Sequence, residues 1–190
     1  MTSPEPSERP QTLEGAVYAA ARGDERALTS LYRTLNPPLL RYLRHHAGPV
    51  AEDVAADVWL ALAPQLTGFE GTFAELRALM FTIARRRVVD HYRRRARRPA
   101  AVPFDDSFEC IDAEDPETLV LDELTAQGAV EALVHCLPAD QAEIVLLRVL
   151  GELEIEQIAN IVGKSTGAVR VAQHRALRRL QQTFRKSVTR

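Results

Sequence analysis

The sequence predicts an all-α protein of two small helical domains joined by an acidic linker. Apolar residues recur at spacings of three and four, and no segment alternates clearly between apolar and polar residues. Proline- and glycine-rich breaks divide the periodic segments, and charge is sorted along the chain. With 190 residues, 46% of them hydrophobic, the chain is long enough for one or two domains with buried cores.

Charge divides the chain into three parts. Residues 1–98 carry 15 basic and 11 acidic side chains, residues 99–140 carry 11 acidic and no basic ones, and residues 141–190 carry nine basic and four acidic ones. The net charge of −2 therefore hides two basic modules around an acidic connector, although a solvated acidic loop would also explain the middle. The resulting division is a tail (1–12), a first domain (13–98), a linker (99–115) and a second domain (116–190).

The first domain contains five predicted helical segments. Gly23 ends the first, Asn36-Pro37-Pro38 breaks or kinks the second, and Pro64 ends the fourth. The segments cover residues 13–22, 24–35, 39–46, 50–63 and 72–97. In the last of them, one apolar face steps by four residues through Leu76, Met80, Ala84, Val88 and Tyr92.

The second domain ends in a helix-turn-helix pattern. Helices are predicted near residues 117–136, 138–150, 154–162 and 166–185. Gly163 can adopt the left-handed conformation that ends one helix, and Ser165 can cap the next. Val169, Ala172, Ala176 and Leu180 face inward in the final helix, which leaves Arg170, His174, Arg175, Arg178 and Arg179 outside the apolar stripe. Such a helix can enter a DNA major groove, although a generic basic hairpin has the same pattern.

Two further charged segments suggest binding. Eight of the 14 residues from 85 to 98 are Arg, and as a helix they extend about 21 Å, enough to follow several phosphates. Tyr92 continues the apolar series, so we expect it to pack in the core. Asp53 and Asp57 are four residues apart, so both carboxylates lie on one helix face. We expect this acidic face to bind a basic protein. Stabilisation of the helix dipole would explain Glu52 and Asp53, and Trp59 is expected in the core.

In this order, these segments resemble the extracytoplasmic-function (ECF) group of bacterial sigma factors. Residues 51–60 resemble that family's AED-x-x-Q-[DE]-V-F stretch, with Ala56 in place of Gln and Trp59 in place of Phe. Residues 79–90 resemble W-L-x-x-I-A-R-N-x-x-x-D, and residues 167–176 resemble G-T-V-K-S-R-x-x-R-A. The resemblance covers about residues 14–98 and 116–184.

The resemblance implies an alternative sigma factor in which each domain has its own partners. Core RNA polymerase would be bound through its β′ clamp helices and β flap, and an anti-sigma factor would control the protein. The implied polymerase-binding residues are Glu52, Asp53 and Asp57. The implied residues for the promoter −10 element are Phe69, Arg85, Arg86, Asp90, Arg93 and Arg94. Those for the −35 element are Thr166, Gly167, Arg170, Val171, His174, Arg175 and Arg178.

Other classes of function are disfavoured. No apolar run approaches the length of a membrane span and the first residues lack signal-peptide order, so we expect a cytoplasmic protein without membrane insertion. We expect no metal, cofactor or catalytic site, because His45-His46 and His135-Cys136 are adjacent pairs without zinc-ligand spacing. Cys110 and Cys136 are interpreted as a loop thiol and a buried small residue. A stand-alone helix-turn-helix regulator and a helical interaction protein remain alternatives.

Overall fold

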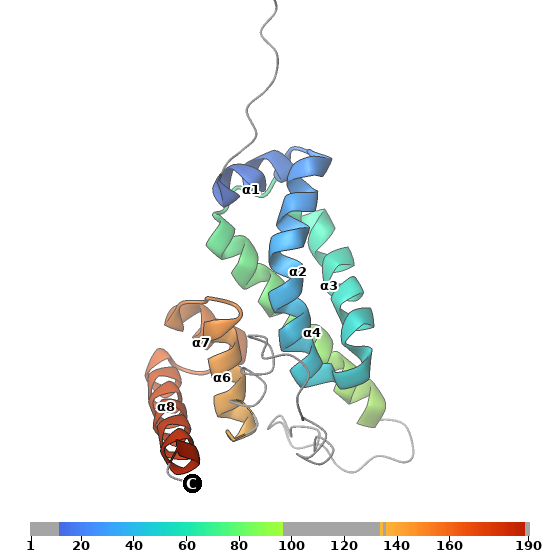
Figure 1. The fold of residues 1–190 in the computed structure, drawn as a ribbon. Coiled ribbons are helices and arrows are strands. Elements are labelled where there is room, and N and C mark those ends of the chain that lie inside the picture. The colour runs from blue at the N-terminus through green and yellow to red at the C-terminus, as the bar shows by residue number, and fades with distance from the viewer. Residues whose placement is uncertain (1–11, 97–133, 135, 189–190) are drawn as a thin grey trace, which may run out of the picture.

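The computed structural model describes residues 12–96, 134 and 136–188, and the regular structure within these residues is helical. This confirms the all-α prediction (Figure 1). The linker and most of the helix expected near 117–136 lie outside the described residues. The elements are α1 (Leu13–Ala21), α2 (Glu25–Ala47), the 3-10 helix η1 (Gly48–Val50), α3 (Ala51–Leu66), α4 (Phe73–Ala96), α6 (Ala139–Val149), α7 (Ile155–Val162) and α8 (Thr166–Val188).

Helices α1 to α4 pack into one helical group around α2. Asp24 begins α2 as predicted, because its Oδ1 accepts hydrogen bonds from the backbone N–H groups of Arg26 at 2.8 Å and Ala27 at 3.1 Å. Glu14 of α1 accepts a hydrogen bond from the Phe73 backbone N–H at 2.8 Å, which ties α1 to the start of α4. The predicted apolar face of α4 is confirmed, since Leu76, Met80, Ala84 and Val88 are all buried.

Proline does not end the helices, although a break or kink was expected in α2 and an end at Pro64 in α3. Helix α2 runs through Pro37 and Pro38, and α3 runs through Pro64 to Leu66. A proline inside a helix costs about 3 kcal/mol, chiefly through the missing N–H and the clash with the preceding turn. Packing offsets this cost, because burying one Leu side chain contributes about 1.5–3 kcal/mol. The buried leucines that flank the prolines are Leu35 and Leu39 in α2, and Leu62 and Leu66 in α3.

Helices α7 and α8 form the predicted helix-turn-helix. Gly163 has a φ of +71°, and its backbone N–H donates to the Ala159 carbonyl at 2.9 Å. The Ser165 hydroxyl accepts a hydrogen bond from the Ala168 backbone N–H at 3.2 Å. Val169, Ala176 and Leu180 are buried against the rest of the domain. Both local predictions for this turn are confirmed.

The two helical groups are not separate bodies, because the second group packs on α4. In Figure 1, α6 and α7 lie beside α4, while α8 lies on the outer side of α6 and α7. Helix α8 packs on α6 and α7, and α7 also contacts α4. This arrangement leaves one side of α8 open and partly covers α4.

Candidate functional site

The acidic residues of α3 lie on the surface. Glu52, Asp53 and Asp57 are all exposed, whereas Val54 and Val58 of the same helix are buried. Glu52 is 3.7 Å from Arg44 of α2, and both side chains are well exposed, so this ion pair contributes little to stability. All three predicted acidic residues are therefore accessible, and Asp53 and Asp57, one turn apart, share one helix face.

A groove between α2 and α3 lies next to this acidic face and was not predicted. Its volume is about 790 Å³, and most of its lining is apolar. Trp59 was expected in the core, but it is only half-buried and forms part of the groove wall. Its indole N–H donates to Asn36 Oδ1 at 3.0 Å, and its ring centroid lies 5.0 Å from that of Tyr32. Other lining residues include Leu28, which is 39% exposed, and Leu60, which is 73% exposed.

The predicted −10 residues of α4 divide into an exposed set and one engaged residue. Arg86, Asp90, Arg93 and Arg94 are exposed. Arg85 differs, because its Nε donates a hydrogen bond to Glu143 Oε1 of α6 at 2.8 Å. The prediction that Tyr92 is a packing residue is confirmed, since it packs against the core and its hydroxyl donates to the His46 carbonyl at 2.5 Å.

The loop before α4 holds Phe69 half-buried rather than fully open. A Cβ on Gly71 would lie 2.5 Å from the Phe69 ring, so only glycine allows this close approach. Glu75 accepts hydrogen bonds from the Thr72 backbone N–H at 2.7 Å and from its hydroxyl at 2.9 Å. Those hydrogen bonds, the backbone one first, lower the pKa of Glu75. A reciprocal capping interaction therefore fixes the end of this loop.

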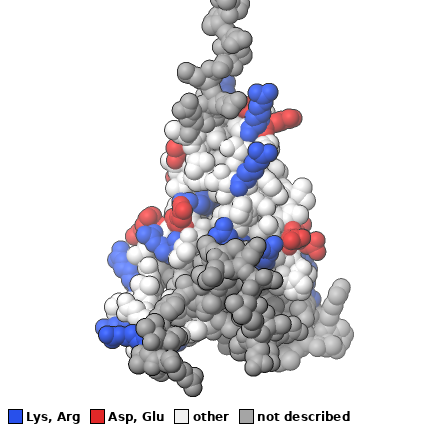
Figure 2. All heavy atoms as spheres, viewed as in Figure 1, with Lys and Arg blue, Asp and Glu red and all other residues white. Residues whose placement is uncertain are grey.

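The predicted −35 residues of α8 are accessible along one side of the helix. Thr166 is half-buried, while Gly167, Arg170, Val171, His174, Arg175 and Arg178 are exposed. Arg170 lies 3.6 Å from Glu156, and more than 60% of each side chain is exposed. Figure 2 shows Lys and Arg side chains over the α7–α8 part of the molecule. This exposed basic face has the form that phosphate and major-groove contacts require.

A buried polar cluster under α6 escaped prediction. Glu143 is 4% exposed and lies beside Tyr42 and Arg85. Burial raises the pKa of Glu143, and the Arg85 charge opposes this rise. Burial, followed by the Glu143 charge, raises the pKa of Tyr42, while burial and the nearby positive charges of His45 and Arg85 lower the pKa of His46. The burial of Glu143 could have been predicted from the sequence, because Glu143 shares a helix face with Leu147 and Leu150, which are also buried.

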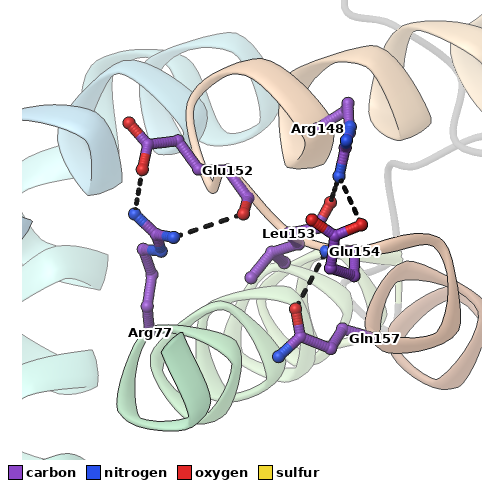
Figure 3. A network of polar contacts seen from close by, with 6 residues as sticks. All are labelled: Arg77, Arg148, Glu152, Leu153, Glu154 and Gln157. Carbon is purple, nitrogen blue, oxygen red and sulfur yellow. Dashed lines mark hydrogen bonds and ion pairs between the residues drawn. The ribbon is translucent and has the colours of Figure 1, made fainter. Parts of the chain in front are cut away.

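A second pair joins the domains at the turn between α6 and α7. Arg77 of α4 donates to the carboxylate of Glu152 and, at 3.2 Å, to the Glu152 backbone carbonyl (Figure 3). Its guanidinium also lies 5.3 Å from the centroid of the Phe73 ring. We call the contact formed by Arg77, Arg85, Glu143 and Glu152 the domain junction.

Within the described residues, no group of three or more His, Cys, Asp and Glu side chains could hold a metal ion. Cys136 is exposed, so its interpretation as a buried residue is wrong. The described helices also include none with the length and apolar character required for crossing a bilayer.

Comparison with known proteins identifies the family. Residues 31–98 match sigma-70 region 2, and residues 127–180 match sigma-70 region 4. The chain is 37% identical to the ECF RNA polymerase sigma factor SigD of Mycobacterium tuberculosis over 94% of this chain and 87% of the relative. It is also 37% identical to the ECF RNA polymerase sigma factor ShbA of Streptomyces griseus, over 90% of this chain and 94% of the relative. The chain belongs to the ECF family of RNA polymerase sigma factors.

The fold of this chain is similar to that of a solved sigma factor. It is similar to the sigma factor RpoE of Bartonella quintana, solved in complex with the anti-sigma factor NepR, with a TM-score of 0.61 and 23% identity over 84% of this chain and 98% of that one. A sigma factor directs RNA polymerase to promoters, so transcription initiation is the process in which this chain acts. The predicted family, fold class and general function are thereby confirmed.

Proposed function

We propose that three surfaces of this sigma factor divide the work of initiation: α3 binds core polymerase, α4 and the loop before it bind the −10 element, and α8 reads the −35 element. The observation that carries the proposal is the separation of charge on accessible faces. Three exposed carboxylates lie on α3, and α8 presents Arg170, Arg175 and Arg178 on its open side. Acidic faces repel DNA and attract basic proteins, whereas basic faces attract phosphates.

The α3 face and the adjoining groove together suit a basic, amphipathic helical partner. Asp53 and Asp57 supply charge, while Trp59 and Leu60 supply apolar area next to them. Apolar burial strengthens such an interface and charge orients it. We assign this surface to the β′ clamp helices, in line with the resemblance of residues 51–60.

The −10 assignment uses α4 and its preceding loop. Arg86, Arg93 and Arg94 are exposed and can contact phosphates, and Phe69 offers a ring for stacking on an unpaired base. Asp90 is exposed on the same helix and completes the family-like set of residues. The β flap would be contacted by the second domain.

The remaining assignments follow from the family. We propose residues 13–98 and 116–190 as the two domains, with 99–115 as the linker between them. The protein would act in the cytoplasm with the polymerase, would leave all RNA chemistry to that enzyme and would need no cofactor. Control by an anti-sigma factor is supported by the solved complex of RpoE with NepR.

Run-off transcription with core polymerase tests the proposal, with start sites mapped on genomic templates. Asp53→Arg combined with Asp57→Arg should abolish assembly with core polymerase and therefore all transcripts. Arg170→Glu combined with Arg175→Glu should leave assembly intact and remove transcription from −35-dependent promoters. The proposal fails if the wild-type chain gives no promoter-directed RNA, and the α3 assignment fails if the first variant assembles normally.

A further inference from the structure

We propose that Tyr18 and Arg22 of α1 form a binding site for single-stranded DNA, with one base stacked on the tyrosine ring and an adjacent phosphate held by the arginine. The strand is the non-template strand that is displaced when a promoter opens, and the site takes a nucleotide directly downstream of the −10 element. The inference rests on the proposed function at one point, the assignment of the loop before α4 to the −10 element.

The Tyr18 ring is open to solvent on a helix whose other face is buried. Its exposed fraction is 64%, whereas Ala16 and Val17 are 2% and 1% exposed. Helix α1 therefore packs its apolar face on the helical group and leaves one aromatic ring outside the core. Proteins bind single strands with little sequence preference by stacking bases on exposed aromatic rings, since every base has a π-face.

Arg22 lies one turn after Tyr18 and places a positive charge beside the ring. Its Nη1 donates a hydrogen bond to the Tyr18 hydroxyl at 3.1 Å, and its guanidinium carbon lies 5.4 Å from the ring centroid. A nucleotide needs both groups, because its base stacks on a ring and its phosphate accepts hydrogen bonds from a guanidinium. The pair therefore has the chemistry of a site for one nucleotide.

The charge of Arg22 is available for a phosphate. Within the described ranges Arg22 forms no ion pair, in contrast to Arg44, Arg77 and Arg85. A guanidinium has five N–H donors, so the bond to the Tyr18 hydroxyl leaves donors for phosphate oxygens. Arg22 can thus bind a phosphate without breaking a contact to a carboxylate.

Two hydrogen bonds fix α1 against the loop that precedes α4. The Gly68 backbone N–H donates to the Ala21 carbonyl at 3.0 Å, and the Phe73 backbone N–H donates to the Glu14 carboxylate at 2.8 Å. Tyr18 lies between these two attachment points and is four residues from Glu14, so the two side chains share a helix face. Figure 1 shows α1 across the end of the helical group, beside the start of α4.

These attachments bring the Tyr18 ring near the loop residue that is proposed to stack on a −10 base. Phe69 directly follows Gly68, and Gly68 is bonded to Ala21. Ala21 is three residues from Tyr18, which is a rise of about 4.5 Å along a helix. A strand held at Phe69 can therefore place a following nucleotide on α1.

The order of the elements gives the direction of the strand. The C-terminal end of α4 is followed in sequence by the linker to the domain that is proposed to read the −35 element, so this end of α4 faces upstream. Helix α4 has 24 residues, a length of about 36 Å, and its two ends meet different parts of a promoter. The loop and α1 lie at the other end and face downstream.

Acidic side chains around the pair limit the strand to a short contact. Asp24 and Glu25 follow Arg22, Glu70 lies in the loop, and all three are exposed. Because carboxylates repel phosphates, we expect the site to neutralise one phosphate rather than follow the backbone. Neutralising one phosphate of a single strand changes the slope of log K against log salt concentration by about 0.7.

The first test compares two promoter fragments bound to the assembled holoenzyme. In the short fragment the unpaired non-template strand ends with the −10 element, and in the long fragment it continues downstream by about six nucleotides. Tyr18→Ala should weaken binding of the long fragment at least fivefold and leave binding of the short fragment unchanged. Tyr18→Phe retains the ring and should keep most of the affinity. Fluorescence anisotropy measures both fragments.

Leu13→Ala is the matched control, because Leu13 is also exposed on α1 but lies on a different face from Tyr18. It should bind both fragments as the wild type does. Wild-type affinity of Tyr18→Ala for the long fragment, or an equal loss in Leu13→Ala, would overturn the proposal.

The salt dependence tests the phosphate contact separately. Arg22→Ala should make the salt slope for the long fragment shallower by about 0.7, whereas Arg33→Ala, which removes an exposed arginine of α2, should leave the slope unchanged. A slope that is the same in Arg22→Ala and in the wild type contradicts the role of Arg22.

Photocrosslinking tests the position of the strand. A long fragment with 5-iododeoxyuridine at the first or second nucleotide downstream of the −10 element should crosslink to Tyr18, and Tyr18→Ala should abolish this crosslink. Crosslinks to Tyr18 only from positions upstream of the −10 element would refute the downstream site.

Failure of the −10 assignment is distinguishable from failure of the α1 site. Phe69→Ala should weaken binding of the short fragment, on which Tyr18→Ala has no effect. If Phe69→Ala binds the short fragment normally while Tyr18→Ala still weakens the long one, the α1 site stands and the loop assignment fails. The opposite pair of results refutes the α1 site and leaves the loop assignment intact.

Discussion

Helices α4 and α8 are both long and rich in arginine, yet their arginines differ in availability. On α8, the pair between Arg170 and Glu156 spans 3.6 Å, and its two side chains are 62% and 65% exposed. On α4, the pair between Arg85 and Glu143 spans 2.8 Å, and the carboxylate is 5% exposed. An exposed pair contributes about 0–1 kcal/mol, whereas breaking a buried pair by removing one partner costs about 3–5 kcal/mol.

The two helices both carry positive charge, but they differ in how accessible that charge is to DNA. Helix α8 can exchange a weak surface partner for a phosphate at almost no cost. Arg85 of α4 first has to release Glu143 of the other domain, whereas Arg86, Arg93 and Arg94 are already exposed. A count of basic residues would treat the two helices alike, although their binding to DNA begins from different states.

The largest expected effect comes from reversing charge on α8. Arg170→Glu combined with Arg175→Glu should weaken binding of the free chain to −35 duplex DNA more than 100-fold, because two phosphate or base contacts become repulsive. Fluorescence anisotropy at several salt concentrations measures this and should also show a shallower salt dependence.

Arg26→Glu combined with Arg33→Glu is the matched control, since it places the same charge change on the exposed surface of α2. An equal loss in the control would mean that net charge, rather than the face of α8, determines binding.

The next effect concerns the turn that reaches α4. Gly151→Ala would place a Cβ 2.5 Å from the Leu147 carbonyl oxygen, so the backbone between α6 and α7 must shift. Overpacking of this kind costs about 1–3 kcal/mol. Urea denaturation should show this loss of stability, and scattering should show a larger radius of gyration because Glu152 moves. A variant as stable and compact as the wild type would contradict the tight packing described for this turn.

Acidification should destabilise the protein through His46. Burial holds the pKa of His46 well below its usual value of 6.5, so below pH 6.5 the unfolded chain takes up a proton that the folded chain does not. The free energy of unfolding should therefore fall by up to about 1.4 kcal/mol per pH unit as pH decreases. Glu143 acts in the opposite direction near its raised pKa, because there the folded state is the one that binds the proton more readily.

Urea denaturation between pH 7 and 5.5 measures this dependence, and His46→Gln should make it shallower. An unchanged slope in the variant would show that other groups produce the pH dependence.

A smaller effect on binding to core polymerase is expected at the groove beside α3. This groove contains no residue of α4 or α8. Asn36→Ala removes the acceptor that orients the Trp59 indole, so binding to core polymerase should weaken by about 1 kcal/mol. In a Trp59→Phe background the same substitution should have almost no effect, since Phe has no N–H to orient. For Asn36→Ala in the wild-type background, titration with core polymerase followed by Trp59 emission measures the affinity. In the Trp59→Phe background, competition with the wild-type chain measures it. Equal losses of affinity in both backgrounds would show that Asn36 does not act by positioning Trp59.

The smallest effect is expected at the start of α8. A Cβ on Gly167 has its nearest neighbour 4.0 Å away, so Gly167→Ala should stabilise the helix by about 0.5 kcal/mol. If Gly167 lies close to DNA as proposed, the same variant should bind −35 duplex less tightly. Higher stability with unchanged DNA affinity would remove Gly167 from the DNA-contact residues.

Local signals explain which parts of this structure were predictable. Gly163 and Ser165 act on neighbours within four residues, so the sequence alone located the turn and the accessible face of α8. Helix continuity through Pro37 was not predictable, because burial of Leu35 and Leu39 by other helices decides it. The groove around Trp59 was not predictable either, because it forms only where α2 and α3 pack together.

The domain junction shows most clearly which contacts could not be predicted from the sequence. Arg85 and Glu143 are 58 residues apart in sequence, and no local pattern relates them. Sequence comparison with a family assigns Arg85 to DNA, and only the packing of α6 on α4 gives it a second partner.

The unbroken α2 has a mechanical consequence. Its 23 residues form a rod of about 34 Å, with Tyr32 and Asn36 in the groove wall and Tyr42 and His46 under the domain junction. Had the prolines divided this helix, the two ends could have moved independently. As one helix, α2 joins the groove beside α3 directly to the residues on which the second domain rests.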